Sequence, residues 1–226
     1  MKVIIIGLGY FGSSLALKLT YLGHDVMGID RDISRVELLK DEISSAICLN
    51  ASDQTALKSL PLEDAELVVV AIGEDFGSSV QALANLKILG LKRIVGRIIS
   101  PVHKTVLEAL GVSETIYPEK ESAERFAIRL EIPGILFSHE ISDGYSIMEA
   151  LLPERYHGLS IKDSGFESRY NVKLISLKKC TIHKNFFGKE ELKYSFISEV
   201  TPDMILQTKD ILIVLGKTKN MIDFLD

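Results

Sequence analysis

The first twelve residues carry the pattern that most constrains this fold: an apolar run followed directly by a glycine loop. The run is Lys2–Ile6, and the glycines Gly7, Gly9 and Gly12 have the spacing G-x-G-x-x-G. The next apolar run ends at Asp30. This order is typical of a βαβ unit that binds a nucleotide: Gly7 permits a tight turn, Gly9 lets the backbone approach a pyrophosphate, and Gly12 lets the first helix pack on the strand. The loop therefore predicts a nucleotide site, with a glycine-rich turn that binds nothing as the weaker alternative.

From residue 1 to about 117, short apolar runs alternate with amphipathic segments. The expected strands are Val3–Ile6, Val26–Asp30, Ile47–Leu49, Leu67–Ile72, Arg93–Val95 and Thr115–Tyr117. The expected helices are Phe11–Leu22, Ile33–Leu39, Gln54–Leu60, Ser78–Leu89 and Pro101–Leu110. Strictly alternating strands and helices predict an α/β domain of the Rossmann-like type, a doubly wound parallel sheet covered on both faces.

After residue 117 the pattern changes. We expect a crossover helix and hinge over residues 118–137, with the helix starting at Pro118 and a break at Pro133-Gly134. Residues 138–226 predict a small α+β domain. Its expected strands are Tyr145–Leu151, Val172–Leu177, Phe196–Val200 and Ile211–Leu215, and its expected short helices are Leu159–Asp163 and Met221–Leu225.

Composition narrows the classes of partner. The net charge of −5 disfavours a general nucleic-acid binder, which needs a basic face. The apolar runs are too short to span a bilayer, and Met1-Lys2 leads straight into a strand, so we expect a soluble, cytoplasmic protein without a signal peptide. Cys48 and Cys180 lie in apolar runs far apart in sequence, which predicts buried, reduced thiols.

Polar residues follow the carboxyl ends of several expected strands and should converge on the glycine loop. Together with loop residues, the expected nucleotide-contacting set is Gly7, Gly9, Tyr10, Phe11, Gly12, Asp30, Arg31, Asn50, Ala51, Asp53, Ile72, Gly73, Glu74 and Arg97. Asp30 should accept hydrogen bonds from ribose hydroxyls and oppose a 2′-phosphate, which disfavours NADP; Arg31 beside it weakens that preference.

Other roles remain open for several of these positions. Asn50–Asp53 would reach the adenine side or cap the helix that starts at Gln54, or do both. Gly73 would allow close approach of a nucleotide or simply end a strand. Arg97 would pair with a phosphate or lie solvated on the surface.

Catalytic patterns are weak in this sequence. His103, in the first turn of an expected helix, predicts an exposed side chain rather than a proton-transfer group, and no Ser-His-Asp order or P-loop lysine is evident. We therefore expect a non-enzyme, with an NAD-dependent oxidoreductase bearing a minimal substrate domain as the alternative.

Several segments together resemble the RCK (TrkA-N/TrkA-C) family of regulatory subunits in Ktr/Trk-type bacterial potassium uptake systems. They are Val3–Gly12, Gly28–Asp30, Asn50-Ala51, Val69–Gly73, Tyr117–Lys120, Tyr145–Glu149, Tyr170–Leu177 and Asp210–Gly216. The resemblance implies a cytoplasmic homodimer that assembles into a larger ring, an octamer, on a membrane potassium channel or transporter subunit at the inner face of the plasma membrane. It implies that nucleotide binding changes the ring and gates potassium flow. Regulation of another ion transporter is the alternative.

The resemblance also assigns roles to single residues. Glu119 matches a glutamate that helps hold a divalent cation near the phosphates at a dimer contact, although a first-turn glutamate stabilised by the helix dipole is as good a hypothesis. Tyr10 stands where relatives commonly have an arginine that reaches a terminal phosphate, so both ATP/ADP and NAD/NADH remain open as ligands. Some relatives bind a cyclic dinucleotide in the carboxyl-terminal domain, near the strand at Val172, but that site does not transfer residue by residue.

Overall fold

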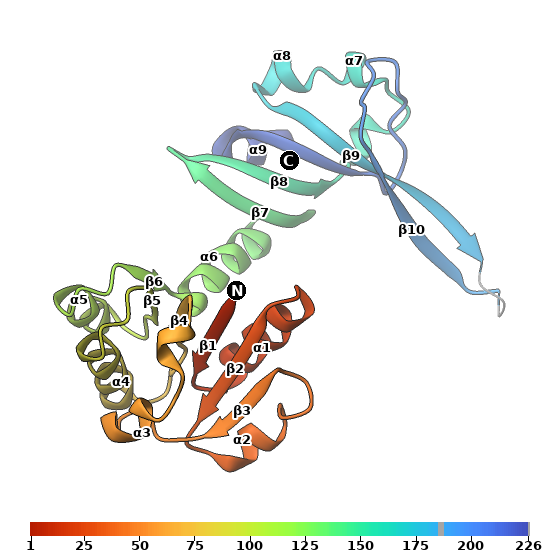
Figure 1. Ribbon diagram of the computed structural model, residues 1–226. Coiled ribbons are helices and arrows are strands. Elements are labelled where there is room, and N and C mark those ends of the chain that lie inside the picture. The colour runs from red at the N-terminus through yellow and green to blue at the C-terminus, as the bar shows by residue number, and fades with distance from the viewer. Residues whose placement is uncertain (185–187, 226) are drawn as a thin grey trace. The chain divides into compact units, whose positions relative to one another are not determined.

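The structure, a computed structural model, describes residues 1–184 and 188–225 (Figure 1). The chain divides into two units, Met1–Lys120 and Glu121–Asp226, with the division inside helix α6 (Pro118–Glu131). Each unit has its own sheet and core. The three-part division at residues 117 and 137 remains a prediction, although the observed division falls three residues beyond the first of these boundaries.

Unit 1 is built on a six-stranded sheet in the order β3-β2-β1-β4-β5-β6, and every strand pair is parallel. The strands are β1 (Lys2–Ile6), β2 (Asp25–Asp30), β3 (Ser45–Cys48), β4 (Leu67–Val70), β5 (Ile94–Arg97) and β6 (Glu114–Ile116). The helices between them are α1 (Tyr10–Tyr21), α2 (Ile33–Glu37), α3 (Gln54–Lys58), α4 (Phe76–Ile88) and α5 (Pro101–Ala109), with a 3-10 turn, η1, at Leu62–Asp64. The predicted doubly wound parallel sheet is confirmed.

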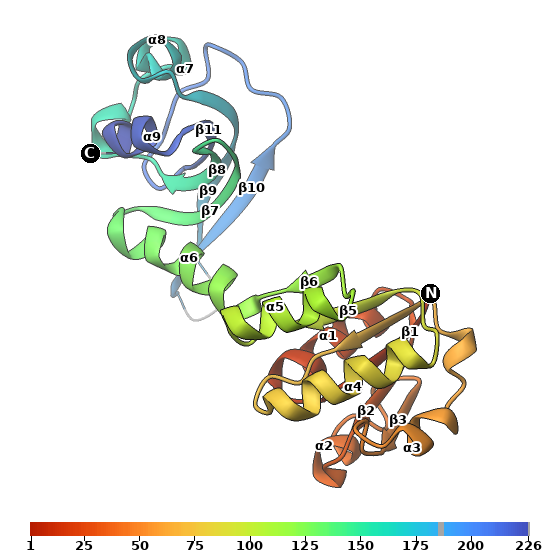
Figure 2. The same ribbon diagram turned by 90° about the vertical axis from the view of Figure 1, so that its left-hand side faces the viewer.

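Two separate apolar cores cover the two faces of this sheet (Figure 2). Alternation along β1 divides its side chains between them: Ile4 and Ile6 pack with α3, α4 and α5, whereas Val3 and Ile5 pack with α1 and α2. A strand buried on both faces reads as a continuous apolar run, and for this reason β1 could be predicted from sequence.

Unit 2 contains a five-stranded antiparallel sheet in the order β10-β9-β11-β8-β7. Its strands are β7 (Ile135–Ser142), β8 (Tyr145–Leu151), β9 (Lys173–Lys184), β10 (Glu190–Ile197) and β11 (Ile211–Lys217). Its remaining helical segments are η2 (Glu154–Tyr156), α7 (Ile161–Ser164), α8 (Phe166–Tyr170) and α9 (Thr218–Leu225). The apolar core lies on one face of the sheet, where Phe166, Met221 and Phe224 from α8 and α9 pack against Leu177 and Leu212.

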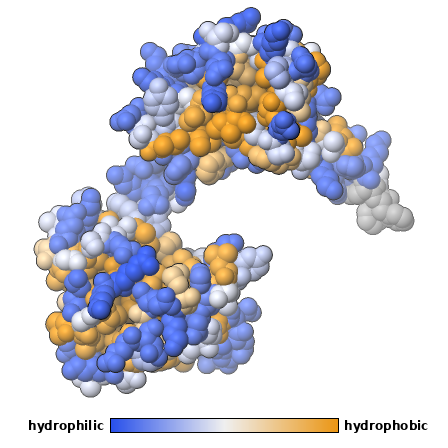
Figure 3. Space-filling model, turned by 45° about the horizontal axis from the view of Figure 1, so that its top comes forward, coloured by the Kyte–Doolittle hydropathy of each residue, from blue (hydrophilic) through white to orange (hydrophobic). Residues whose placement is uncertain are grey.

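The opposite face of the second sheet carries no helical layer of its own unit. Exposed large apolar side chains of the unit 2 strands are Leu136, Phe137, Ile141, Tyr145, Leu151, Ile175, Ile182, Leu192, Tyr194 and Phe196. Figure 3 shows an extended hydrophobic area on the surface of this unit. Contiguous apolar surface of this kind marks contact with another molecule.

Several expectations about single elements were wrong. Strand β7 begins at Ile135, inside the segment expected to be a hinge, and the β9–β10 hairpin is much longer than the two short strands expected there. Cys48 is exposed rather than buried, and His103 is fully buried rather than exposed. Ser100 caps α5, since its hydroxyl accepts from the His103 N–H at 3.1 Å.

Candidate functional site

A pocket lies at the carboxyl ends of β1, β2 and β4, the edge where parallel α/β sheets bind ligands. Of the residues predicted from sequence, it is lined by Gly7, Gly9, Tyr10, Phe11, Asp30, Arg31, Asn50, Ala51, Ile72, Gly73, Glu74 and Arg97. Ser52, inside the Asn50–Asp53 segment expected at the adenine side, also lines it, as does Asp75 next to Glu74; Arg35 and Ser78 line it and were not predicted. The structure thus brings together residues from five separate loops of unit 1 around one space.

Two of the predicted residues do not line the pocket, and each has a structural role instead. A Cβ atom on Gly12 would lie 1.8 Å from the Gly7 carbonyl oxygen, so only glycine allows α1 to pack this closely on the loop. Asp53 caps α3, accepting the N–H groups of Thr55 and Ala56 at 2.8 and 3.3 Å. Capping, one of the two roles weighed for the Asn50–Asp53 segment, is therefore present.

The glycine loop leads into a helix start that presents backbone N–H donors. Gly7 turns with a φ of +95° and donates its N–H to the Ile29 carbonyl at 2.7 Å. Gly9 is the N-cap of α1, where no side chain caps the helix and no acidic residue occupies the first turn. The free N–H groups and the positive end of the helix dipole therefore favour an anion at this point.

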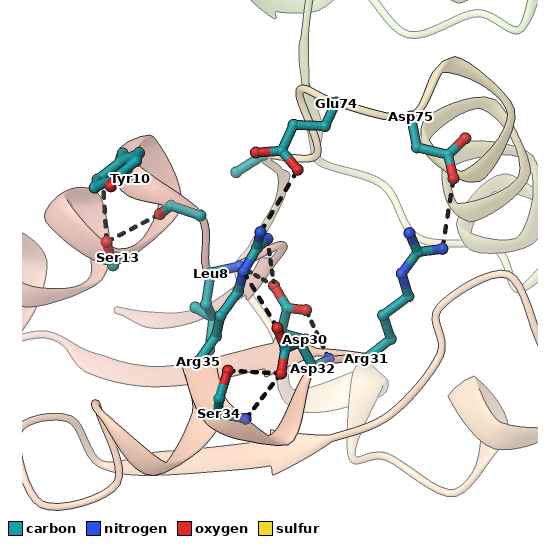
Figure 4. Close-up of polar contacts among 12 residues, drawn as sticks. Leu8, Tyr10, Ser13, Asp30, Arg31, Asp32, Ser34, Arg35, Glu74 and Asp75 are labelled. Carbon is teal, nitrogen blue, oxygen red and sulfur yellow. Dashed lines mark hydrogen bonds and ion pairs between the residues drawn. The ribbon is translucent and has the colours of Figure 1, made fainter.

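Asp30 supports the loop as well as facing the pocket. Its Oδ2 accepts the Leu8 N–H at 2.7 Å and its Oδ1 accepts the Asp32 N–H at 2.9 Å (Figure 4). The side chain is only 6% exposed, so these charge-assisted bonds are well shielded from water. A carboxylate has further lone pairs, and those that remain on Asp30 are available to ribose hydroxyls.

Arg35 occupies the mouth of the pocket among three carboxylates (Figure 4). Its Nη1 lies 3.6 Å from Asp30 Oδ2, its Nη2 lies 3.5 Å from Glu74 Oε2, and its Nε lies 3.8 Å from Asp32 Oδ2. Partial burial opposes its charged form, but the nearby carboxylates of Asp30 and Glu74 outweigh this and raise the pKa of Arg35 above its usual value. The same Nη1 is 3.6 Å from the position that a Cβ on Gly9 would take, so the guanidinium lies against the glycine loop.

Arg31 turns the other way and bridges β2 to the start of α4. Its Nη1 lies 3.4 Å from Asp75 Oδ2 and 3.5 Å from the Ser78 hydroxyl. Asp75 is itself the N-cap of α4, and hydrogen bonds from Ser78, followed by the charge of Arg31, lower the pKa of its carboxyl. Arg31 is therefore tied to a fixed helix cap.

Arg97 is held deep in the pocket rather than solvated on the surface. Its side chain is 15% exposed, its Nη1 donates to the Ala71 carbonyl at 3.1 Å, and its Nη2 pairs with Glu119. The guanidinium also lies 5.4 Å from the centre of the Phe11 ring. It occupies the space beside Gly73, where a Cβ would come within 2.4 Å of it. Gly73 therefore accommodates Arg97.

Glu119, the expected cation ligand, is paired with this arginine. Within residues 1–184 and 188–225, no group of three or more His, Cys, Asp or Glu side chains is arranged to hold a metal ion. Tyr10 is 96% exposed. Its ring points outward, and only its backbone carbonyl is engaged, by the Ser13 hydroxyl at 3.2 Å (Figure 4).

The fold and the pocket define a Rossmann-type nucleotide-binding domain followed by a small α+β domain, and comparisons with known proteins agree. The TrkA-N domain model matches residues 3–118, about half of the chain. The chain belongs to the TrkA-N family, which confirms the resemblance seen in the sequence.

Curated relatives match almost the whole chain. Ktr system potassium uptake protein C of Bacillus subtilis (strain 168) is 29% identical over 220 residues, covering 97% of this chain and 94% of the relative. Ktr system potassium uptake protein A of the same organism is 28% identical over 217 residues, covering 96% and 92%.

Among solved structures, the "GsuK channel bound to NAD" superposes with a TM-score of 0.62 at 15% identity, covering 99% of this chain and 39% of that one. At this identity the likeness concerns the fold. No helix in the described part of the chain has the length and apolar character needed to cross a bilayer.

Proposed function

We propose that this protein is the nucleotide-sensing regulatory subunit of a bacterial potassium uptake system. The observation that carries the proposal is the pocket itself, in which an uncapped helix N-terminus and a buried ribose-type acid, Asp30, face one space. The Ktr system relatives support it because they match this chain over more than nine-tenths of both lengths. A regulatory subunit must bind its ligand better in one conformation than in another, since otherwise binding shifts no equilibrium.

The ligand class is an adenine nucleotide that carries a pyrophosphate, either ATP/ADP or NAD/NADH. Asp30 supplies an acceptor for ribose hydroxyls, and the first turn of α1 supplies donors for phosphate oxygens. The outward ring of Tyr10 adds no positive charge for a terminal phosphate, which favours NAD(H), whose internal pyrophosphate needs only the loop. The GsuK channel, similar in fold, has been solved with NAD bound. A divalent cation at Glu119 would require that carboxylate to leave Arg97.

The partners follow from the same proposal: a second copy of this chain within a ring, and a membrane subunit that conducts potassium. The exposed apolar face of the unit 2 sheet supports association, because monomeric proteins rarely leave such a surface uncovered. An octameric ring and a cyclic dinucleotide in unit 2 belong to the proposal as inferences from the family resemblance. The location is then the cytoplasmic face of the membrane, through the partner.

The test has a binding arm and a transport arm. Mass spectrometry of ligand released from the purified protein, followed by calorimetry with ATP, ADP, NAD and NADH, should identify one adenine nucleotide that binds tightly. Asp30→Asn should weaken it about tenfold while keeping one acceptor for the loop N–H groups, which Asp30→Ala would leave unpaired. In cells, deletion of the gene should change potassium uptake, and Asp30→Asn should reproduce part of that change. Steady turnover of NADH with a substrate, or uptake that does not respond to deletion, would contradict the proposal.

A further inference from the structure

Three arginines line the pocket in the described part of the chain, and they differ in what they face. Arg31 faces the N-cap of α4 at 3.4 Å, and Arg97 lies largely buried between a backbone carbonyl and Glu119. Arg35 alone of the three lies against Gly9, and its three carboxylate contacts of 3.5–3.8 Å all exceed the 2.7–2.9 Å of a charge-assisted hydrogen bond. It is attracted from three sides without being fixed by any one of them.

Of the three carboxylates around Arg35, Glu74 forms the weakest ion pair. This carboxylate is 82% exposed, so water screens the ion pair and makes it easy to exchange. On the opposite side, the guanidinium already lies against Gly9, beside the uncapped first turn of α1. A phosphate bound at that turn would offer Arg35 two oxygens at hydrogen-bonding distance, which suits the planar guanidinium better than three long contacts do.

We propose that Arg35 makes this pocket select nucleotides with a 5′-diphosphate, by exchanging Glu74 for a phosphate oxygen beside Gly9. The inference rests on the nucleotide site of the proposed function and names the residue that discriminates among its ligands. Before the ligand enters, Arg35 neutralises part of the charge of Asp30 and Glu74. After entry, it spans the phosphate and Asp30, and Glu74 is released to solvent.

The exchange also explains the acidic character of the mouth. Asp30, Asp32, Glu74 and Asp75 outnumber the two arginines, Arg31 and Arg35, at this rim. Without a mobile cation, such a rim would repel a diphosphate. When Arg35 contacts the bound phosphate, its positive charge offsets the negative charge of the ligand where the ligand lies closest to Asp30.

Calorimetry on the full chain tests the proposal with adenosine, AMP, ADP, NAD and adenosine 2′,5′-bisphosphate as probes. In the Arg35→Gln variant, affinity for ADP and NAD should fall about tenfold to a hundredfold, while affinity for adenosine changes less than about threefold. Glu74→Gln removes the competing carboxylate and should raise ADP affinity about threefold. Arg35→Lys keeps the positive charge but loses the planar guanidinium that can bind two oxygens at once. Its ADP affinity should lie between those of Arg35→Gln and the wild type.

The matched control is Arg93→Gln, an arginine of unit 1 that pairs with Glu114 and does not line the pocket. It should change ADP and adenosine affinity alike, by less than about threefold. Equal loss of adenosine and ADP in Arg35→Gln would overturn the proposal, as would a loss confined to the 2′,5′-bisphosphate, which would place Arg35 at a ribose phosphate. If the wild type binds none of the five probes, the proposed function fails as well; if it binds ADP or NAD and Arg35→Gln binds equally well, only this inference fails.

Discussion

The two sheets of this protein differ in how much of each face is covered by helices of the same unit. The parallel sheet of unit 1 is covered by helices on both faces, and the candidate site lies at its carboxyl edge. The antiparallel sheet of unit 2 is covered by its own helices on one face only, and its other face carries exposed Phe137, Ile175 and Phe196. The carboxyl edge of the first sheet offers a pocket for a small molecule, whereas the second sheet offers an area suited to another protein surface.

This difference suits the two units to different kinds of binding partner. The proposed function assigns ligand recognition to the strand ends of unit 1 and association to the extended apolar surface of unit 2. The TrkA-N model covers residues 3–118 and ends near the boundary of the first unit. Variants that damage one unit without affecting the other should therefore separate the two properties.

The largest effect is expected at the tightest contact in unit 1. Gly12→Ala would place a Cβ 1.8 Å from the Gly7 oxygen and should lower the free energy of unfolding by about 4 kcal/mol. Gly9→Ala is the control, because its Cβ would meet only Arg35, at 3.6 Å; it should cost less than about 1 kcal/mol and yet weaken nucleotide binding. Thermal unfolding and calorimetry measure the two effects, and equal destabilisation by both substitutions would contradict the packing role of Gly12.

A slightly smaller effect is expected in the core of unit 2. Asp210 is fully buried and accepts from Lys179 Nζ at 2.7 Å, the Gln207 N–H at 2.9 Å and the Cys180 N–H at 3.1 Å. Asp210→Ala leaves these donors unpaired and should cost about 3 kcal/mol, whereas exposed Asp203→Ala should cost less than about 0.5 kcal/mol. Nucleotide affinity at 10 °C should stay within twofold, and its loss would show that the two units do not act separately.

The third effect concerns association rather than folding. Phe196 is 62% exposed on β10, and Phe196→Glu should weaken self-association at least about tenfold, as measured by light scattering across a dilution series. Ile88→Glu, at an apolar residue on α4 of unit 1 that is 72% exposed, is the matched control and should leave the oligomer intact. If Ile88→Glu dissociates the oligomer and Phe196→Glu does not, the assembly surface lies in unit 1.

The smallest effect is a pH dependence of unit 1. His103 is buried, its ring nitrogens have no hydrogen-bond partner among the described residues, and burial lowers its pKa below the usual 6.5. The unfolded chain therefore binds a proton at His103 more readily than the folded chain does. The free energy of unfolding falls as the pH drops through 6.5, and His103 has no effect on it at pH 8. His103→Leu should flatten the dependence of the melting temperature between pH 8 and 5, whereas His24→Gln should leave it unchanged. A slope that survives in His103→Leu would assign the dependence to other groups.

Much of unit 1 could be predicted from sequence because its signals are local. Strands buried on both faces are continuous apolar runs, and helix ends are marked by glycines such as Gly23, Gly90 and Gly111, all of which have positive φ. The glycine loop and Asp30 could be located because their spacing follows from the βαβ geometry. Element boundaries in unit 1 differ from the expected ones by at most two residues, as is usual where element ends fray.

What could not be predicted depends on contacts distant in sequence or on strands without a buried face. Strand β10 is exposed along nearly its whole length. Its alternation of apolar Leu192, Tyr194 and Phe196 with polar Lys193 and Ser195 is a strand signal that the expected range Phe196–Val200 did not use. Arg35 and Glu74 are 39 residues apart, and nothing local indicates that they meet across the pocket. His103 is buried because it packs against Phe76 of the neighbouring helix, with ring centres 5.1 Å apart.

The two backbone hydrogen bonds of Asp30 have a consequence for signalling. With the Leu8 and Asp32 amides already tied before any ligand arrives, the loop is preorganised, and binding loses little conformational entropy in ordering it. Amide hydrogen exchange at these positions should therefore be slow with or without nucleotide. The proposed function then assigns the conformational response to the ion pairs of Arg31 and Arg35, which join the end of β2 and helix α2 to Asp75 and Glu74 before α4.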